Sequence, residues 1–372
     1  MKKIISISII ATIAAFASAC ANTTTTNTAT TTSNSNALNG DKLATIQGTV
    51  WIANEEGNSL TVVDAGTNKV ITTLTGIEGP HNVQMSPDNK TVWAVSGHKS
   101  LAVAIDAATY TLKGTVPTGK SPAHIILTPD GKSVYVTNGG DDSVTVIEAA
   151  TLKVVATIPA GKSPHGLRSS PDGKCIYVAN VNDTKVSVIE TATNTKVADI
   201  EVGQKPAQVG FSPDGKFVYV SLVAENAVAK IDVASRTVTG KAQVGSGPIQ
   251  VFVSPNDKYL LVANQGTEST PGTTISVIDT ATFTVVKTVE TGKGAHGVVI
   301  EPSSRYAYIT NIFGNSVAIL DLATLEITAT VPMGLKPNGI TFSSLAPSPA
   351  PAAEIAIALP ETKDSDDGDM KH

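Results

Sequence analysis

The sequence has little charge, few aromatic residues and almost no cysteine, and each shortage narrows the range of possible protein classes. Charged residues are 16% and aromatic residues 4% of the 372 residues, and the formal net charge is −5. The basic footprint of a protein that binds duplex nucleic acid is missing, so nucleic acid is not an expected partner, although a single strand held in a groove stays open. The two cysteines, Cys20 and Cys175, lie too far apart for a C-x-x-C-H haem site.

Long apolar runs are also scarce, and the run at the N-terminus is short. Residues 1–19 have the layout of a secretory signal, with Lys2 and Lys3, an apolar run from Ile4 to Phe16, and small residues before Cys20. Such a run is too short to span a bilayer as a permanent helix. The sequence therefore predicts an exported protein.

The end of this segment, Ala17-Ser18-Ala19-Cys20, resembles the lipobox of bacterial lipoproteins, although that family prefers Leu where this chain has Ala17. The resemblance implies a lipid on Cys20, on an outer-membrane or periplasm-facing lipoprotein or at the cell surface. Ordinary cleavage before an unmodified Cys20 is the alternative. Residues 20–46, rich in Thr, Asn and Ser, then predict a tether. Residues 345–372, rich in Pro and Ala and later acidic, predict a disordered tail.

The middle of the chain repeats one unit of about 42 residues. An aromatic or apolar residue recurs in it at Trp51, Trp93, Tyr135, Tyr177, Tyr219, Leu261 and Tyr308. An acidic residue recurs at Asp64, Asp106, Glu148, Glu190, Asp232, Asp279 and Asp321. In both series one step is 47 residues long, which places five extra residues between Leu261 and Asp279. Repeats of roughly 40–45 residues with four strands each indicate the blades of a β-propeller.

Each unit contains four short strand-like stretches. In the unit around Tyr135 the pattern predicts strands over residues 124–128, 133–137, 143–147 and 154–158. The first unit supplies three strands from near Val50, and the last ends in an extra inner strand over residues 338–342, which can complete the first blade and remove an exposed edge. The predicted fold is all-β: a monomeric, seven-bladed propeller of four-stranded blades over residues 47–344, closed by its C-terminal inner strand.

The repeated acidic residue is followed three positions later by Thr or Ser in every unit. A carboxylate and a hydroxyl at this offset can satisfy backbone N–H groups in a turn. We therefore interpret the acidic series as structural. Candidate functional residues are those at which one blade departs from the repeat.

The motif Tyr135-Val136-Thr137-Asn138 and its variants, such as Tyr177-Val178-Ala179-Asn180, resemble the repeat of the YVTN-repeat β-propellers. The resemblance covers residues 48–344 and is specific for fold rather than function. That family includes surface-layer and periplasmic binding propellers, lactonase-like enzymes, and the propeller subunits of quinoprotein and amine dehydrogenases. The resemblance therefore implies either a binding protein or an enzyme.

Histidines break the repeat at the first residue of the predicted inner strands. In chain order this position reads His81, Ala123, His165, Ala207, Ile249, His296 and Asn338. Three imidazoles at one mouth of the channel predict a transition-metal site of His81, His165 and His296, with copper favoured over zinc on intrinsic affinity. The alternative is that each histidine caps its own turn or meets solvent.

Four further residues are candidates for ligand binding at this mouth. Arg168 stands at an inner-strand position that is uncharged in the other units compared, and its charge suits an anion. His124 lies one residue further into its strand and is expected to face differently, whereas His98 lies in a loop that opens on the same face. Asn338 takes the histidine position in the closing strand. The lengthened loop over residues 264–274 is expected to overhang the mouth.

The preferred interpretation is a non-enzymatic binding or scaffold protein of the cell envelope, lipid-anchored, that engages a protein partner or small ligand at the histidine-bearing mouth. One alternative is a propeller that binds copper, or zinc, through the histidines. Another is a lactonase-like enzyme or a dehydrogenase-type subunit, which would need a base, an electrophile or a cofactor in the channel.

Overall fold

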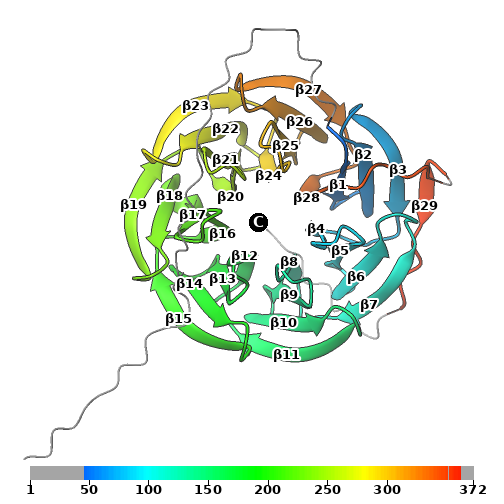
Figure 1. Ribbon diagram of the computed structural model, residues 1–372, viewed down its shortest axis with the longest axis horizontal. Helices are drawn as coiled ribbons and strands as arrows, with labels where there is room; N and C mark the ends of the chain where they lie inside the picture. The colour runs from blue at the N-terminus through cyan, green and yellow to red at the C-terminus, as the bar shows by residue number, and fades with distance from the viewer. Residues whose placement is uncertain (1–45, 351, 362–372) are drawn as a thin grey trace, which may run out of the picture.

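The computed structural model describes residues 46–350 and 352–361. Seven β-sheets surround a central channel like the blades of a propeller (Figure 1). Six sheets have four strands and the sheet that contains β1 has five. The predicted seven-bladed, all-β fold is therefore confirmed. Within these residues the single helical segment is the 3-10 turn η1 (Val223–Glu225), and no helix among them is long and apolar enough to cross a membrane.

The strands next to the channel are the innermost strands of the blades. They are β28 (Pro337–Ser343), β4 (Val83–Met85), β8 (Pro122–Leu127), β12 (Pro164–Ser169), β16 (Pro206–Phe211), β20 (Pro248–Val253) and β24 (Ala295–Ile300). The second strands are β1 (Thr49–Asn54), β5 (Thr91–Ser96), β9 (Ser133–Asn138), β13 (Cys175–Asn180), β17 (Phe217–Leu222), β21 (Tyr259–Gly266) and β25 (Tyr306–Asn311).

The remaining two strands lead outward from the channel. The third strands are β2 (Ser59–Asp64), β6 (Leu101–Asp106), β10 (Ser143–Glu148), β14 (Lys185–Glu190), β18 (Ala227–Asp232), β22 (Pro271–Asp279) and β26 (Ser316–Asp321). The outer strands are β3 (Lys69–Thr75), β7 (Leu112–Pro117), β11 (Lys153–Pro159), β15 (Thr195–Glu201), β19 (Thr237–Gln243), β23 (Thr284–Glu290) and β27 (Glu326–Pro332).

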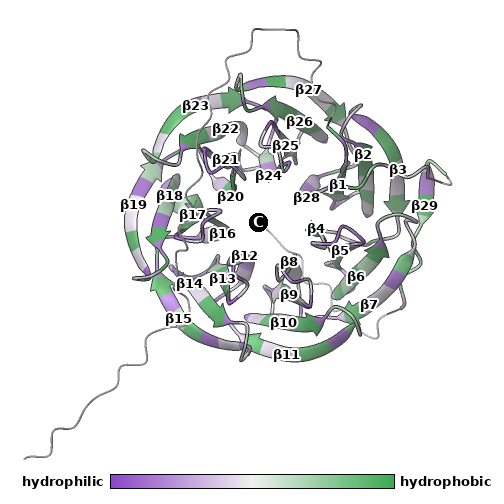
Figure 2. Ribbon diagram, viewed as in Figure 1, coloured by the Kyte–Doolittle hydropathy of each residue, from purple (hydrophilic) through white to green (hydrophobic). Residues whose placement is uncertain are grey.

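The hydrophobic core lies between neighbouring blades. All six residues of β13 are buried, whereas most residues of the outer strand β15 are exposed. Polar and apolar residues accordingly mix along the outer strands (Figure 2). Strands covered on both faces need apolar side chains on both faces, which explains why strict alternation is weak in this sequence. The repeated aromatic residue of the second strand, such as Tyr135, is fully buried in this core.

The acidic series forms the turn between the third and outer strands, as predicted. Asp106 accepts hydrogen bonds from the backbone N–H of Thr109 at 2.9 Å and from its hydroxyl at 3.0 Å. In the next blade Glu148 accepts a hydrogen bond of 2.5 Å from the Thr151 hydroxyl. These carboxylates therefore stabilise the blades and lie away from the channel.

The ring closes through the two ends of the propeller sequence. Strand β28 pairs antiparallel with β1, with Phe342 opposite Val50. The first blade thus takes its innermost strand from the C-terminal part of the chain and its next three strands from the N-terminal part. This closure agrees with the prediction and covers the edge of β1, which would otherwise be exposed.

The segment that follows the closing strand differs from the prediction of a disordered tail over residues 345–372. Strand β29 (Glu354–Ala356) pairs parallel with β3 and gives the first blade its fifth strand. The buried Ile357 packs against the core between the first two blades, and Lys99 lies 3.6 Å from Glu361. For residues 352–361 the prediction is therefore wrong, because an exposed sheet edge offered pairing that composition alone does not show. The acidic residues 364–369 lie outside the described residues.

Candidate functional site

The entry to the inner strands is irregular, and this irregularity builds the site. In β8 the register moves from Pro122 opposite Asn138 to Ile125 opposite Val136, so two residues face one. The same bulge occurs in β12, between Pro164 and Leu167. A bulge re-aims side chains and interrupts the alternation of a strand. The first and the second residue after the proline can therefore both project toward the channel.

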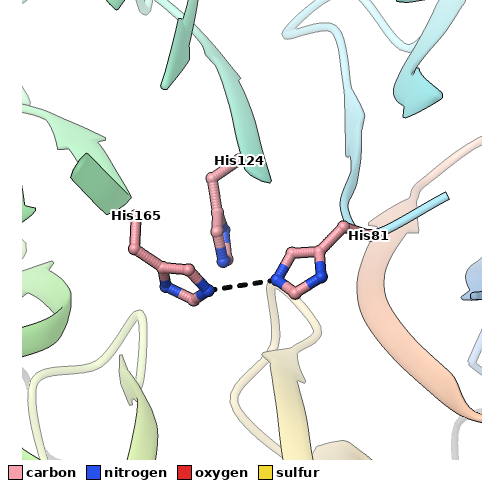
Figure 3. Close-up of side chains that lie close together, drawn as sticks. All are labelled: His81, His124 and His165. Atoms are coloured by element: carbon pink, nitrogen blue, oxygen red, sulfur yellow. Dashed lines mark hydrogen bonds between the residues drawn. The ribbon is translucent and has the colours of Figure 1, made fainter. Parts of the chain in front are cut away.

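Three histidines from consecutive blades meet at this entry. They are His81, just before β4, His124 in β8 and His165 in β12 (Figure 3). One ring nitrogen of each lies within 4.8 Å of those of the other two, and the Nε2 atoms of His81 and His165 are 3.1 Å apart. Two nitrogens that bind one metal ion at tetrahedral angles lie about 3.3 Å apart for bonds of about 2.05 Å. The His81–His165 pair is close to this spacing, and His124 lies within reach of both.

The tautomer of His81 is set by the first blade. Its Nδ1 lies 3.1 Å from Oε1 of Glu55, and Oε2 of the same carboxylate accepts a hydrogen bond of 2.7 Å from the Asn338 side-chain amide. The Asn338 amide nitrogen also lies 3.0 Å from this Nδ1. Because that nitrogen already donates to Oε2, and a carboxylate only accepts hydrogen bonds, the contact with Glu55 places the proton of His81 on Nδ1. The Nε2 atom then presents its lone pair to the cluster, which is the arrangement that orients histidines in metal sites.

The tautomer of His165 is set by the neighbouring blade. Its Nδ1 lies 3.1 Å from the backbone carbonyl oxygen of Ala207, which can only accept. The next residue in the strand is Gly166, and a Cβ there would collide with that carbonyl group and with the Gln208 side chain. The absence of a side chain thus lets β16 approach closely enough to orient His165. Its Nε2 also presents a lone pair.

His124 completes the cluster, with its ring between the other two in Figure 3. The side chain is fully buried, and its Nε2 atom makes no hydrogen bond within the described protein. Its Nδ1 lies 3.5 Å from the Gln208 amide nitrogen, at the limit of hydrogen bonding. Burial lowers the pKa of His124 well below its usual value, and the charges of His165, His81 and Arg168 add to this shift. His124 is therefore a neutral imidazole, the form that binds metal ions.

The three facing nitrogens differ in their hydrogen bonding. The Nε2 atoms of His81 and His165 lie 3.1 Å apart, a hydrogen bond that needs a proton on one of them, whereas the buried Nε2 of His124 lies beside them without a hydrogen bond. A shared proton can bridge two of these nitrogens, but a metal ion satisfies all three. The donor set therefore fits a transition-metal ion of the kind that prefers imidazole, such as copper or zinc.

The remaining predicted site residues lie around this cluster. The sequence prediction gave His296 the third position, which His124 takes in the structure. The ring of His296 is buried, and its centroid lies 6.2 Å from that of His81. His98 is exposed on the loop after β5, over Gly79. Asn338 donates a hydrogen bond to Glu55, which contacts His81, and Arg168 lies on β12. Cys20 lies outside the described residues.

Two supporting residues escaped the sequence reasoning. Glu55 follows β1 in a loop, and Gln208 is the third residue of its inner strand, β16. The signal for Gln208 was its alignment with His124 at the second position after the proline, a position that the prediction did not compare between blades. Nothing in the local sequence marks Glu55, because its contact with Asn338 spans 283 residues.

The lengthened loop of the sixth blade is a long hairpin rather than an irregular loop. Strands β21 and β22 extend it, and Gly266 pairs with Pro271 near its tip. Glu268 at the tip lies 3.5 Å from Lys336, which precedes the closing strand β28. The hairpin therefore reaches toward the seam of the ring.

Comparisons with known proteins agree with this architecture. Hydrazine synthase from Kuenenia stuttgartiensis is similar, with 26% identity, a TM-score of 0.64, and coverage of 72% of this chain and 90% of that chain. A functionally unknown protein from Desulfotomaculum acetoxidans DSM 771 has 15% identity, a TM-score of 0.71, and coverage of 80% and 99%. The dihydro-heme d1 dehydrogenase NirN, solved in complex with DHE, has 15% identity, a TM-score of 0.61, and coverage of 81% and 76%.

Sequence comparisons place the chain within one propeller family. No match was found among curated proteins. A model of a family described as YNCE-like beta-propeller matches residues 98–346, which is more than half of the sequence. The match spans six of the seven blades in whole or in part, together with the closing strand β28. The chain therefore belongs to the YNCE-like β-propeller family.

Proposed function

We propose that this protein is a metal-binding propeller whose channel holds one transition-metal ion through His81, His124 and His165. The observation that carries the proposal is the meeting of three imidazole nitrogens within 4.8 Å of one another, with the buried Nε2 of His124 left without a hydrogen bond among the described residues. The Nδ1 contacts of His81 and His165 to acceptors give these two rings the tautomer that a metal site requires. Copper is the preferred ion on intrinsic affinity, followed by zinc.

The proposal includes the setting in which the protein works. The apolar run over residues 4–16 and the small residues before Cys20 favour export and a lipid anchor. In that setting the propeller is a binding protein of the cell envelope, and a protein partner or small ligand would meet it at the mouth that carries the histidines. Labelling with a radioactive or alkyne fatty acid, compared between the natural chain and Cys20→Ala, tests the anchor. A label that persists in the variant contradicts lipidation at this residue.

Elemental analysis tests the metal site directly. The metal-free chain is exposed to Cu(II) or Zn(II), dialysed extensively and analysed beside the variants His124→Ala and His165→Ala. We expect about one metal ion per chain, lost in both variants. His98→Ala is the matched control, because this exposed histidine lies outside the cluster. Equal metal retention in His165→Ala, or no retention in the natural chain, contradicts the proposal.

A second candidate function is catalysis at the same metal site. The similarity to hydrazine synthase, an enzyme by its name, favours this candidate because the identity of 26% extends over 90% of that chain. Three protein ligands on a tetrahedral metal ion leave one position open for a substrate, as in catalytic zinc sites. Turnover by the metal-loaded protein, absent from His165→Ala, would support catalysis. A metal-loaded protein without turnover on lactones and small redox substrates would leave binding as its function.

A further inference from the structure

One inner-strand residue places a charge where the other six blades have none. Arg168 is the fifth residue of β12, three residues beyond His165. The corresponding residues of the other blades are Gln84, Ile126, Gly210, Phe252, Val299 and Thr341. The repeat does not need an arginine at this position to form a blade. This departure from the repeat therefore calls for a reason other than folding.

The Arg168 side chain can be reached from the channel. Strand β12 is the innermost strand of its blade and contacts β8, β13 and β16 of its own and adjacent blades. Arg168 is nevertheless partly exposed, and so is the following Ser169. Because protein covers the strand on its other sides, the solvent that reaches Arg168 is the water of the channel.

Among the described residues no carboxylate forms an ion pair with Arg168. Its Nη1 donates a hydrogen bond of 2.9 Å to the backbone carbonyl of Leu167. Burial lowers the pKa of Arg168 to about 10, and no acidic group offsets this shift. The guanidinium therefore stays protonated at neutral pH, with most of its five donors still available to a ligand. The carboxylate that touches the histidine cluster, Glu55, contacts His81 and Asn338.

Arg168 lies on the same inner strand as His165, three residues or about 10 Å further along the channel. Strand β8, which carries His124, contacts this strand. A metal ion bound by His81, His124 and His165 would add a second positive charge to the same channel. Two cations in a partly desolvated channel repel each other unless an anion lies between them. A metal ion with three imidazole ligands also keeps a coordination position open.

We infer that the channel binds a small oxyanion with two adjacent oxygen atoms, such as a carboxylate or nitrate, between Arg168 and the metal ion held by His81, His124 and His165. The planar guanidinium presents paired N–H groups that match two oxygens of one anion. This inference rests on the proposed metal site and names the class of ligand that the site takes. The anion neutralises Arg168 and occupies the open position of the metal ion.

Formate is a suitable probe, because it is small and has two equivalent oxygens. Sodium formate is titrated into the copper-loaded chain at constant ionic strength, and the copper absorption and electron paramagnetic resonance spectra are recorded. We expect saturable spectral shifts, with an affinity at least about 10-fold weaker in Arg168→Gln at unchanged copper content. Arg168→Lys keeps the charge without the paired donors and is expected to fall between the two.

A matched control comes from the outer face of the propeller. Arg236 lies in the turn after β18, away from the channel, so Arg236→Gln should bind formate like the natural chain. An Arg168→Gln variant with the formate affinity of the natural chain overturns the inference. A variant that loses copper together with formate also overturns it, because Arg168 would then support the metal site rather than an anion.

A second measurement separates this inference from the proposed metal site. If the chain retains no copper, thermal unfolding of the metal-free protein is followed with and without formate at constant ionic strength. Stabilisation of the natural chain but not of Arg168→Gln would support the anion site while the metal proposal fails. Equal responses of the two proteins would overturn the anion site as well.

Discussion

The two ends of the inner strands follow opposite rules. At the end where the strand turns back, five of the blades carry a Ser or Thr hydroxyl hydrogen-bonded to an Asp or Asn two residues later. These pairs are Ser86–Asp88, Thr128–Asp130, Ser170–Asp172, Ser212–Asp214 and Ser254–Asn256. At the entry, the same blades carry different residues, and the histidine cluster lies there. Residues that recur from blade to blade stabilise the repeat, whereas positions that differ between blades can carry functional side chains.

The turn between β24 and β25, in the seventh blade, shows that a departure from the repeat is not by itself a functional site. Glu301 replaces the hydroxyl residue there, and its carboxylate accepts hydrogen bonds from the backbone N–H groups of Ser303, Arg305 and Tyr306. One longer carboxylate thus does the work of the hydroxyl and the Asp together. A departure points to function only where the new group faces the channel and is not used by its own turn.

The largest expected difference between the two strand ends comes from removing His124 from the cluster. His124→Leu is expected to lower copper affinity by about 100-fold or more, because one of three ligands is lost. The free energy of unfolding of the metal-free variant should be unchanged or higher, because a buried nitrogen without a hydrogen bond is replaced by an apolar group. Copper competition with a chelator and urea unfolding measure the two effects. A metal-free variant destabilised by more than about 1 kcal/mol would make His124 a structural residue.

The next effect concerns the carboxylate that orients His81. Glu55→Gln should weaken copper binding by about 10- to 100-fold, since outer partners of metal ligands contribute this much. Glu56→Gln is the matched control, because the adjacent exposed Glu56 pairs with Lys336 instead. The same chelator competition reports both. Equal copper affinity in the two variants would show that Glu55 does not support the site.

At the other end of the strand, the expected effect is on stability alone. Asp130 accepts hydrogen bonds of 2.7 Å from the Thr128 hydroxyl and 3.0 Å from the Lys132 backbone N–H. Asp130→Ala should lower the free energy of unfolding by about 1 kcal/mol and leave metal content unchanged. A double-mutant cycle with Thr128→Val measures how much of this loss comes from the pair. Metal loss in Asp130→Ala would contradict the separation of the two ends.

The smallest effect is an acid sensitivity of the same turns. Side-chain hydrogen bonds from Ser86 and Thr128 lower the pKa values of Asp88 and Asp130. A carboxyl whose pKa is lower in the folded state stabilises the fold above its unfolded pKa, and this contribution disappears as the pH falls through the folded value. The urea midpoint should therefore decrease below about pH 4. The decrease should be smaller in Ser86→Ala/Thr128→Val, and an equal decrease would assign the acid sensitivity to other groups.

The sequence predicts the blades well because their signals are local. In the unit around Tyr135 the predicted strands agree with β8 to β11 to within two residues, since each ends at a turn with its own chemistry. The closing strand was also predicted, because an inner strand without a following blade has one place to pair. By contrast, β29 was not predicted, because it pairs through backbone groups and its residues do not belong to the repeated pattern.

The candidate site was harder to predict for a geometric reason. Successive side chains of a strand normally point to opposite faces. His124 lies one position further into its strand than the aligned His81, His165 and His296. Alternation therefore predicted that His124 faces away from the others and left His296 as the third ligand. The bulge in β8 removes the alternation, and nothing in the residues Pro122 to Ile125 announces it. The support from Glu55 required knowing that the closing strand brings Asn338 beside it. Contacts between distant repeats depend on how the closed propeller brings the blades together, and the sequence of a single repeat does not contain this information.

The contact between Glu55 and Asn338 has a consequence for how the protein is made. Asn338 belongs to the last inner strand to leave the ribosome, and it steadies the carboxylate that orients His81. A chain that emerges or is exported N-terminus first carries all three cluster histidines long before that strand arrives. The fully oriented site therefore forms only after β28 has been made and the ring has closed, so a chain that ends before Asn338 would not carry it in this form.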